Sequence, residues 1–244
     1  MFNNLDTYTL QARVSPVLIV AFPLVLWIAS LFPGEASGLG LLTGLLSFSG
    51  LGPLIGQFGR DNGLKKQKKL FAAWGDKPTT RFFRHRDSKF SPVMLTALHR
   101  NMHHLIDGTP EVTPEEEQKD PAGADNTYDR WTIFLKEATR DTGKFPLVHA
   151  ENINYGFRRN LYGLKWLGVC AALWPLLAFG WSLQGIQPEG FPSAMDKATL
   201  TVSLLALAYY LKVVSPDWVK TVAEAYAERL LLASDKLAKE NGKT

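Results

Sequence analysis

The chain has 244 residues, a formal net charge of +4 and a single cysteine. This length accommodates one or two domains, and the small net charge does not indicate any class of binding partner. One cysteine excludes an intramolecular disulfide, as expected of a reducing compartment or a membrane interior. Hydrophobic residues make up 46% of the chain, but they are concentrated in a few apolar blocks on either side of one highly charged segment.

Four apolar segments are candidates for membrane spans, because a bilayer core needs about 20 mostly apolar residues per helix. Residues 14–32 and 38–58 form the first pair and carry no charged side chain. Residues 167–186 and 200–214 form the second pair, and the shorter span ends near Lys212, whose long side chain can reach the headgroups. The sequence therefore predicts an all-α protein with four transmembrane helices.

Basic residues orient the predicted spans, since cytoplasmic loops carry an excess of Lys and Arg. The middle segment holds 19 of the 27 Lys and Arg residues, whereas the two short loops hold only Lys197. A cleaved signal peptide is disfavoured, because a second apolar span follows the first at once. The middle segment and both termini are therefore expected in the cytoplasm. The predicted order is a transmembrane hairpin at 1–58, a cytosolic insert at 59–166, a second hairpin at 167–214 and a cytosolic C-terminal helix at 215–244.

The second predicted span is rich in small residues at the small-xxx-small spacing that lets membrane helices approach closely. No ionisable residue lies at a predicted bilayer centre, which disfavours an ion-coupled transporter but leaves a pore lined by small and hydroxyl residues open. The residues assigned to helix packing or to a pore lining are Gly40, Thr43, Gly44, Ser47, Gly52 and Gly56. Acidic rings at the outer mouth are assigned to Glu35, Glu189 and Asp196.

The cytosolic insert divides by charge into a basic and an acidic half. Residues 60–100 contain 11 basic and 3 acidic side chains, and residues 101–162 contain 7 and 11. Such blocks of like charge often mark interaction surfaces.

Local signals in the insert predict mainly helices. We expect one helix over 64–74 and another over 92–106, capped by Asp87 or Ser91. Residues 107–126, which contain Pro, Gly and acidic residues, are expected to form a mobile loop. A further helix is expected to begin at Asp125, Asn126 or Thr127 and to stop at Gly143.

The segment RFFRHRD (residues 81–87) alternates basic side chains with aromatic rings. Arg and Lys contact phosphates and rings stack on bases, so a nucleotide or a single-stranded nucleic acid fits this pattern, as do phosphate-bearing headgroups. Topology alone also explains basic residues beside a span. The residues assigned to binding a polyanion or nucleotide are Lys65, Lys66, Arg81, Arg84, His85, Arg86, Arg158 and Arg159.

Evidence for an enzyme is weak in this sequence. His99, His103 and Asp107 are expected on one helix face and could hold a metal, but no Glu follows the first His as zinc peptidases require. Phosphate-binding and nucleophile-elbow motifs are absent. We predict no catalytic residue, no metal and no cofactor, and keep a metal-dependent membrane hydrolase as the least favoured alternative.

The C-terminal segment predicts a helix from Asp217 to about Glu240. Its apolar positions recur at steps of four and three, which fits a short coiled-coil seam between copies or packing against the insert. These positions are Val219, Ala223, Tyr226, Leu230, Ala233 and Leu237.

The layout resembles the small four-span effectors of bacterial anti-phage systems, and most closely the Hailong-type membrane channel effector. The resemblance lies in the architecture: the spans VSPVLIVAFPLVLWIASLF and GLGLLTGLLSFSG, a basic insert with RFFRHRD, and two further spans. It implies a homo-oligomeric channel, taken as a tetramer, in the bacterial inner membrane, whose opening depolarises the cell. It also implies a nucleotide or oligonucleotide ligand made by a partner nucleotidyltransferase and sensed by the insert. The alternative is a non-catalytic membrane scaffold that recruits a cytosolic partner.

Overall fold

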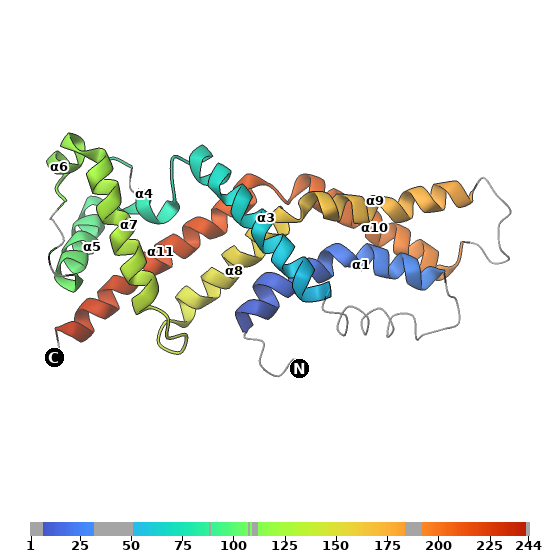
Figure 1. Ribbon diagram of the computed structural model, residues 1–244, viewed down its shortest axis with the longest axis horizontal. Coiled ribbons are helices and arrows are strands. Elements are labelled where there is room, and N and C mark those ends of the chain that lie inside the picture. Colours follow the sequence, from blue (N-terminus) through green and yellow to red (C-terminus); the bar gives the residue numbers. More distant parts are fainter. Residues whose placement is uncertain are drawn as a thin grey trace. The chain divides into compact units, whose positions relative to one another are not determined.

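The computed structural model describes residues 7–31, 51–87, 89–106, 108, 112–183 and 192–242, apart from the side chains of 51–53 and 55. Within these residues every regular element is helical (Figure 1), which confirms the all-α prediction. The chain divides into two compact units. Unit 1 comprises Met1–Gln67 and Gly156–Val219, and unit 2 comprises Lys68–Tyr155 and Lys220–Thr244.

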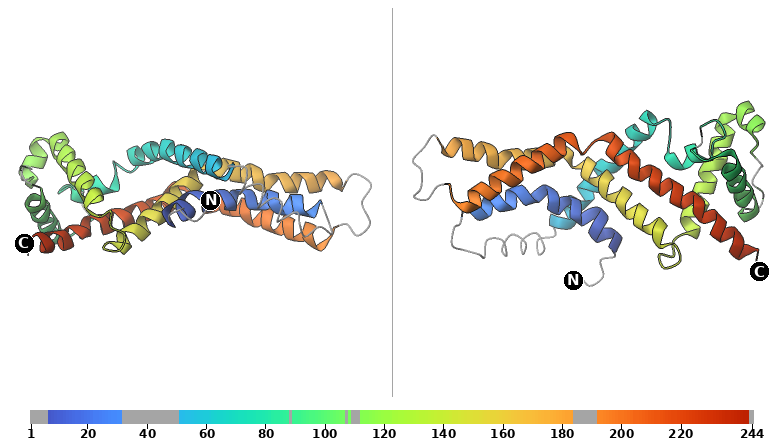
Figure 2. Two further views of the ribbon diagram at one scale, coloured as in Figure 1. Left: turned by 60° about the horizontal axis from the view of Figure 1, so that its bottom comes forward. Right: turned by 180° about the vertical axis from the view of Figure 1, so that it is seen from behind.

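Unit 1 is built on three apolar helices that pack against one another in pairs. They are α1 (Ser15–Ser30, preceded by the π-helical turn η1, Thr9–Val14), α9 (Lys165–Ser182) and α10 (Ala194–Lys212), and they run side by side in Figures 1 and 2. The first part of α3 (Leu51–Ala73) and the end of α8 (Pro146–Gly163) belong to the same unit. The buried apolar cluster of unit 1 consists of Val17, Val20, Leu161, Leu164, Ala171, Tyr210 and Val214.

One described helix, Thr9–Ser30, is by itself long and apolar enough to cross a membrane. Two further pairs, α8 with α9 and α10 with α11 (Pro216–Asn241), reach that standard only if each bent pair counts as one span, with bends of 59° and 70°. Thr9–Ser30 corresponds to the predicted span at 14–32. Most of the predicted span at 38–58 lies outside the described residues.

Close helix contacts in unit 1 depend on glycine. A Cβ on Gly168 of α9 would lie 2.5 Å from Cζ of Tyr210 on α10, so only glycine leaves room for that ring. A Cβ on Gly163 would lie 2.6 Å from the backbone nitrogen of Gly63 and 2.7 Å from the carbonyl oxygen of Gly59. The backbones of α3 and α8 therefore approach each other through glycines at small-xxx-small spacing.

Unit 2 is a cluster of helices around an aromatic core. Its helices are α4 (Pro78–Phe83), α5 (Pro92–Leu105), α6 (Pro114–Lys119) and α7 (Pro121–Ala138), with the beginning of α8 and most of α11. The core includes Phe82, Phe83, Leu98, Met102, Tyr128, Trp131, Leu135, Leu230 and Leu231.

Several local predictions for unit 2 can be compared with its helices. Ser91 caps α5 through the Met94 amide as expected. The prediction of an irregular loop over 107–126 is wrong in its second half, because Thr113 and Glu116 form a capping box that starts α6 and Asp120 caps α7. Helix α7 therefore begins before Asp125, and it ends at Ala138 rather than at Gly143.

The apolar stripe of α11 packs within unit 2. Leu230 and Ala233 are buried in the core of this unit, and Tyr226 and Leu237 pack against it. Of the two interpretations of this stripe, the structure thus favours packing against the insert.

Candidate functional site

The two phenylalanines of RFFRHRD belong to the core of unit 2. Phe82 and Phe83 end α4 and are 2% and 0% exposed. The Phe83 ring stacks on Tyr128 at a centroid distance of 5.9 Å and meets Trp131 edge-on at 5.2 Å. These rings stabilise the core and are not available for stacking on bases.

Arg84 is the centre of an internal ion-pair network. Its Nε and Nη2 donate to the two carboxylate oxygens of Asp125 at 2.8 and 2.9 Å. Nη2 also donates to Asp76 at 2.7 Å, and Nη1 donates to the carbonyl of Gly75 at 3.0 Å. The Arg84 side chain is only 9% exposed, and its guanidinium donates to acceptors of its own unit.

Glu117 of α6 fixes the chain that follows Arg84. Its side chain is 2% exposed, and it accepts hydrogen bonds from the backbone amide of His85, from Nη1 of Arg86 and from the hydroxyl of Tyr128, each at 2.7 Å. Burial alone would raise the pKa of this carboxyl, but the four hydrogen bonds from Tyr128, His85 and the amide and side chain of Arg86 hold it below the usual value. Burial also raises the pKa of the Tyr128 hydroxyl, so it remains a donor at neutral pH.

The remaining basic residues of the segment are paired as well. Arg81 donates from Nε to Asp87 at 2.9 Å, and this hydrogen bond lowers the pKa of the Asp87 carboxyl. Arg86 reaches Asp125 at 3.0 Å in addition to Glu117. The segment was predicted to bind a polyanion. That role stays a prediction, but the carboxylates of unit 2 already neutralise its three arginines.

Two lysines of unit 1 stabilise helix ends. Lys66 donates from Nζ to the carbonyl of Tyr162 at 2.7 Å, where α8 ends. Lys165 donates to the carbonyl of Val214 at 2.8 Å, where α10 has ended. Terminal carbonyls lack helical partners, so each lysine caps one of the two helix breaks. Burial, together with the nearby Lys165, lowers the pKa of Lys66. Lys165 was not among the residues predicted from the sequence, because no neighbouring residue indicates that it contacts the carbonyl of Val214.

The other predicted basic residues of unit 1 also have partners, with one exception. Arg158 donates to the carbonyl of Trp218 at 2.9 Å and lies over its ring at 4.8 Å. Arg159 donates to Gln67 at 3.0 Å. Lys65 is exposed, and it is the member of the predicted set that has no contact within the part of the chain that the structure describes.

Six of the nine predicted pore residues lie outside the described residues. Glu35, Gly40, Thr43, Gly44, Ser47 and Glu189 lie outside the described residues, as does the side-chain environment of Gly52. Gly56 lies against η1, where a Cβ would be 3.4 Å from the carbonyl oxygen of Arg13. Asp196 accepts from the amide of Ser193 at 2.9 Å in a capping box at the start of α10.

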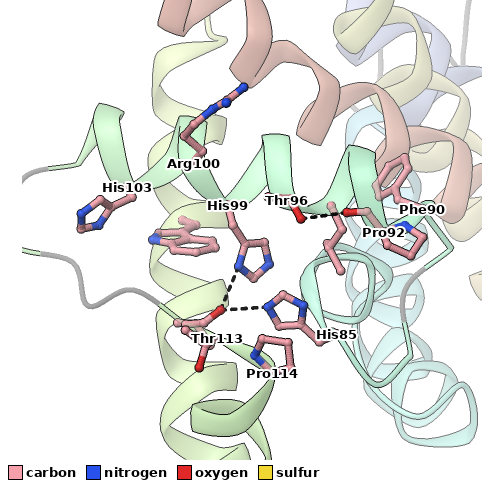
Figure 3. A pocket seen from close by; sticks show the side chains of 12 residues that line it. His85, Phe90, Pro92, Thr96, His99, Arg100, His103, Thr113 and Pro114 are labelled. Carbon is pink, nitrogen blue, oxygen red and sulfur yellow. Dashed lines mark hydrogen bonds between the residues drawn. The ribbon is translucent and has the colours of Figure 1, made fainter.

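A cavity of about 650 Å³ lies beside His85 and His99 in unit 2 (Figure 3). One face of α5 lines it, together with residues before α5 and at the start of α6. The two imidazole rings are 4.4 Å apart. His85 Nε2 lies 2.8 Å and His99 Nδ1 lies 3.2 Å from the carbonyl oxygen of Val112. The lining residues are His85, Phe90, Pro92, Leu95, Thr96, His99, Arg100, His103, Val112, Thr113, Pro114 and Trp131.

His99 is held by backbone carbonyls on both sides of its ring. Nε2 is 2.8 Å from the carbonyl oxygen of Phe83, opposite the Val112 contact. Burial, with His85 nearby, lowers the pKa of His99, and the two carbonyl contacts offset this only in part. Neither nitrogen is therefore open to a metal, and Asp107 lies outside the described residues. Among the described residues there is no group of three potential metal ligands.

Comparison with known proteins gives no relative from which a role could be transferred. No protein-family model, curated protein or solved structure matches this chain. Over the residues that the structure describes, the fold defines an all-helical protein with one helix long and apolar enough to cross a membrane and a second helical unit that contains a cavity.

Proposed function

We propose that this protein is a multi-span membrane effector whose insert, residues 59–166, receives a cytosolic signal. The observation that carries the proposal is the apolar surface of unit 1. Large apolar side chains are exposed on all three packed helices, among them Phe22 of α1, Trp181 of α9 and Leu205 of α10, at 49%, 80% and 66%. A soluble protein rarely exposes so much apolar surface, and lipid is the partner that fits it.

The proposed topology places both termini and unit 2 in the cytoplasm of a bacterium, with unit 1 in the inner membrane. The helix breaks capped by Lys66 and Lys165 support this arrangement, because lysines and arginines are enriched at the cytoplasmic ends of spans. Trp166 and Trp218 lie beside these breaks, and tryptophan is enriched at membrane interfaces.

The proposed output is an ion path formed by a homo-oligomer and gated by a nucleotide or oligonucleotide. The resemblance to four-span anti-phage effectors supports this output. The three packed helices of unit 1 also support several copies, since their shared core is filled by close contacts such as that between Gly168 and Tyr210. An ion path would then run between subunits.

The direct test is to reconstitute the purified chain in liposomes that hold a potassium diffusion potential and to follow a potential-sensitive dye. We expect loss of the potential on adding, or on withdrawing, a single-stranded DNA oligonucleotide or a nucleotide. Lys65→Glu should shift the ligand dependence, and Lys119→Glu, an exposed lysine of unit 2, serves as the control. Reversing Arg81, Arg84 and Arg86 together would be a poor test, because it breaks the internal ion pairs. Vesicles that keep their potential under every condition would reject the channel.

The second candidate is a non-catalytic membrane scaffold. It is favoured by exposed apolar side chains on unit 2, above all Val93 of α5, which is 83% exposed, and Ile133 of α7, which is 62% exposed. A scaffold predicts a partner that co-purifies with the chain and no conductance in the liposome experiment.

A further inference from the structure

Three cations of unit 1 lie at the breaks between its helices. Lys66 donates to a carbonyl in the last turn of α8, and Lys165 is the first residue of α9 on the other side of that break. Lys165 donates in turn to the carbonyl of Val214, just beyond the end of α10. Arg158 of α8 donates to the carbonyl of Trp218, in the first turn of α11. The two breaks are therefore held by one cluster of positive charge, formed by Lys66, Arg158 and Lys165.

No carboxylate neutralises this cluster. Within the part of the chain that the structure describes, none of its three members forms an ion pair. The arginines of RFFRHRD in unit 2 differ in this respect, because each has a carboxylate partner. Burial, together with the like charge of Lys165, lowers the pKa of Lys66. An anion bound here would relieve the repulsion between the cations.

Two members of the cluster keep donors for such an anion, since a guanidinium and an ammonium each have several N–H groups. Arg158 uses Nη1 for the carbonyl of Trp218, and its Nε and Nη2 have no partner among the described residues. Neither of these two atoms is enclosed without a partner, so both reach the surface of unit 1. Lys165 donates to the carbonyl of Val214, which leaves its remaining N–H groups for a ligand.

The surface beside the cluster is aromatic and apolar. Arg158 lies 4.8 Å from the ring centroid of Trp218, and Lys165 lies 5.8 Å from that of Trp166. Trp166 and its neighbour Leu167 are 64% and 45% exposed. Tryptophan is enriched where a membrane meets water. A soluble anion gains nothing from this exposed apolar surface, whereas a lipid can place its phosphate on the cations and an acyl chain along α9.

We propose that Lys66, Arg158 and Lys165 bind the phosphate of an anionic membrane lipid such as phosphatidylglycerol. The phosphate accepts from Arg158 and Lys165, and Lys66 adds its charge. Basic pockets between membrane helices are suited to such headgroups. This inference rests on the proposed function only for the location of unit 1 in a membrane. It assigns Lys66 and Arg158 to a lipid, in place of the soluble polyanion predicted from the sequence.

The test is native mass spectrometry of the full-length chain from detergent micelles that contain either phosphatidylglycerol or phosphatidylcholine. A titration gives the apparent Kd of the first bound lipid, and we expect phosphatidylglycerol to bind more tightly than phosphatidylcholine. Arg158→Gln and Lys165→Gln should each weaken phosphatidylglycerol binding about tenfold, the loss expected for one charge-assisted hydrogen bond. Both variants should leave phosphatidylcholine binding unchanged.

The matched control is Lys212→Gln, because Lys212 is exposed near the same end of α10 and reports the general attraction of a cation for anionic lipid. It should leave the first bound phosphatidylglycerol in place. Circular dichroism checks the helix content of each variant, since loss of a cap can loosen a helix break. Arg158→Lys keeps the charge and should recover part of the affinity that Arg158→Gln loses.

The outcomes separate this inference from the proposed function, because lipid binding in micelles needs no membrane potential. A chain that prefers phosphatidylglycerol but passes no ions would reject the channel and support the lipid site. Equal affinity of the unchanged chain for the two lipids would overturn the site, as would equal losses in Arg158→Gln and Lys212→Gln. Release of the bound lipid by inorganic phosphate, but not by sodium chloride of the same ionic strength, would identify a soluble phosphate as the ligand and overturn the lipid assignment.

Discussion

Arg84 and Asp125 form a two-pronged ion pair, Nε to Oδ1 at 2.8 Å and Nη2 to Oδ2 at 2.9 Å, although 41 residues separate them in the chain. The pair joins the end of α4 to α7, and Asp76 and the carbonyl of Gly75 complete the shell around the guanidinium. A basic segment that looks like a ligand site in the sequence thus holds unit 2 together.

Removing one partner of this pair should destabilise unit 2. Arg84→Met leaves Asp76 without its cation and leaves Asp125 with Arg86 alone, and a broken, largely buried pair costs about 3 kcal/mol. Hydrogen exchange of α7 amides in the full-length chain should report this as faster exchange. The matched control is Arg140→Met, because Arg140 and Glu137 form a pair whose side chains are 76% and 57% exposed. A double-mutant cycle with Asp125→Asn should give a favourable coupling, and equal exchange in the two arginine variants would contradict the role of Arg84.

Acid should destabilise unit 2 in part through His99. Burial places its pKa below the usual 6.5, so the unfolded chain binds the proton first. The stabilisation is complete above about pH 6.5 and falls as the pH decreases toward the folded-state pKa. The titratable groups near the ring are His85, Tyr128 and Glu117.

The pH effect can be measured as amide exchange in α5 between pH 7.5 and 5.5. His99→Gln, which can still donate to the carbonyl of Phe83, should show a smaller loss of protection over this range than the unchanged chain. His104→Gln, at an exposed position of α5, is the control and should behave like the unchanged chain. If His99→Gln retained the full pH dependence, the titrating group would lie elsewhere.

A methyl group at Gly168 should disturb the packing of α9 against α10. The added Cβ would lie 2.5 Å from the Tyr210 ring, and overpacking of this kind typically costs about 1–3 kcal/mol. Gly168→Ala should therefore lower the melting temperature of the chain in micelles. Gly180→Ala on the same helix is the control, because nothing lies within 4 Å of its added Cβ. Equal melting temperatures for the two variants would mean that α9 and α10 do not pack in this way.

Cys170 provides a test of membrane insertion, because it is the only cysteine and is exposed on α9. If unit 1 is embedded in lipid, a charged, water-soluble maleimide should not label Cys170 in native membranes but should label it after denaturation in detergent. For orientation, Glu115→Cys in a Cys170→Ser background should be labelled in inside-out vesicles only. Labelling of Cys170 in intact membranes would place α9 in water.

Features set by neighbouring residues were predictable from the sequence. The 22 residues from Thr9 to Ser30 form an apolar helix, Ser91 caps α5, and α11 runs from Pro216 to Asn241. Each depends on composition, helical periodicity or a capping side chain within a few positions. The helix start at Pro114 was missed because the acidic and proline-rich composition of 107–126 suggested a loop, while the capping box of Thr113 and Glu116 decided for a helix.

The sequence by itself determined the helical class, the apolar character of α1 and the places where several helices begin and end. The tertiary structure alone decided the partners of the charged residues: Asp125 for Arg84, Glu117 for Arg86, and helix-end carbonyls for Lys66 and Lys165. It also decided that α11 packs into unit 2. The physical reason is distance along the chain. Helix formation is decided within a few residues, whereas an ion pair or a cavity depends on which distant segments the fold brings together.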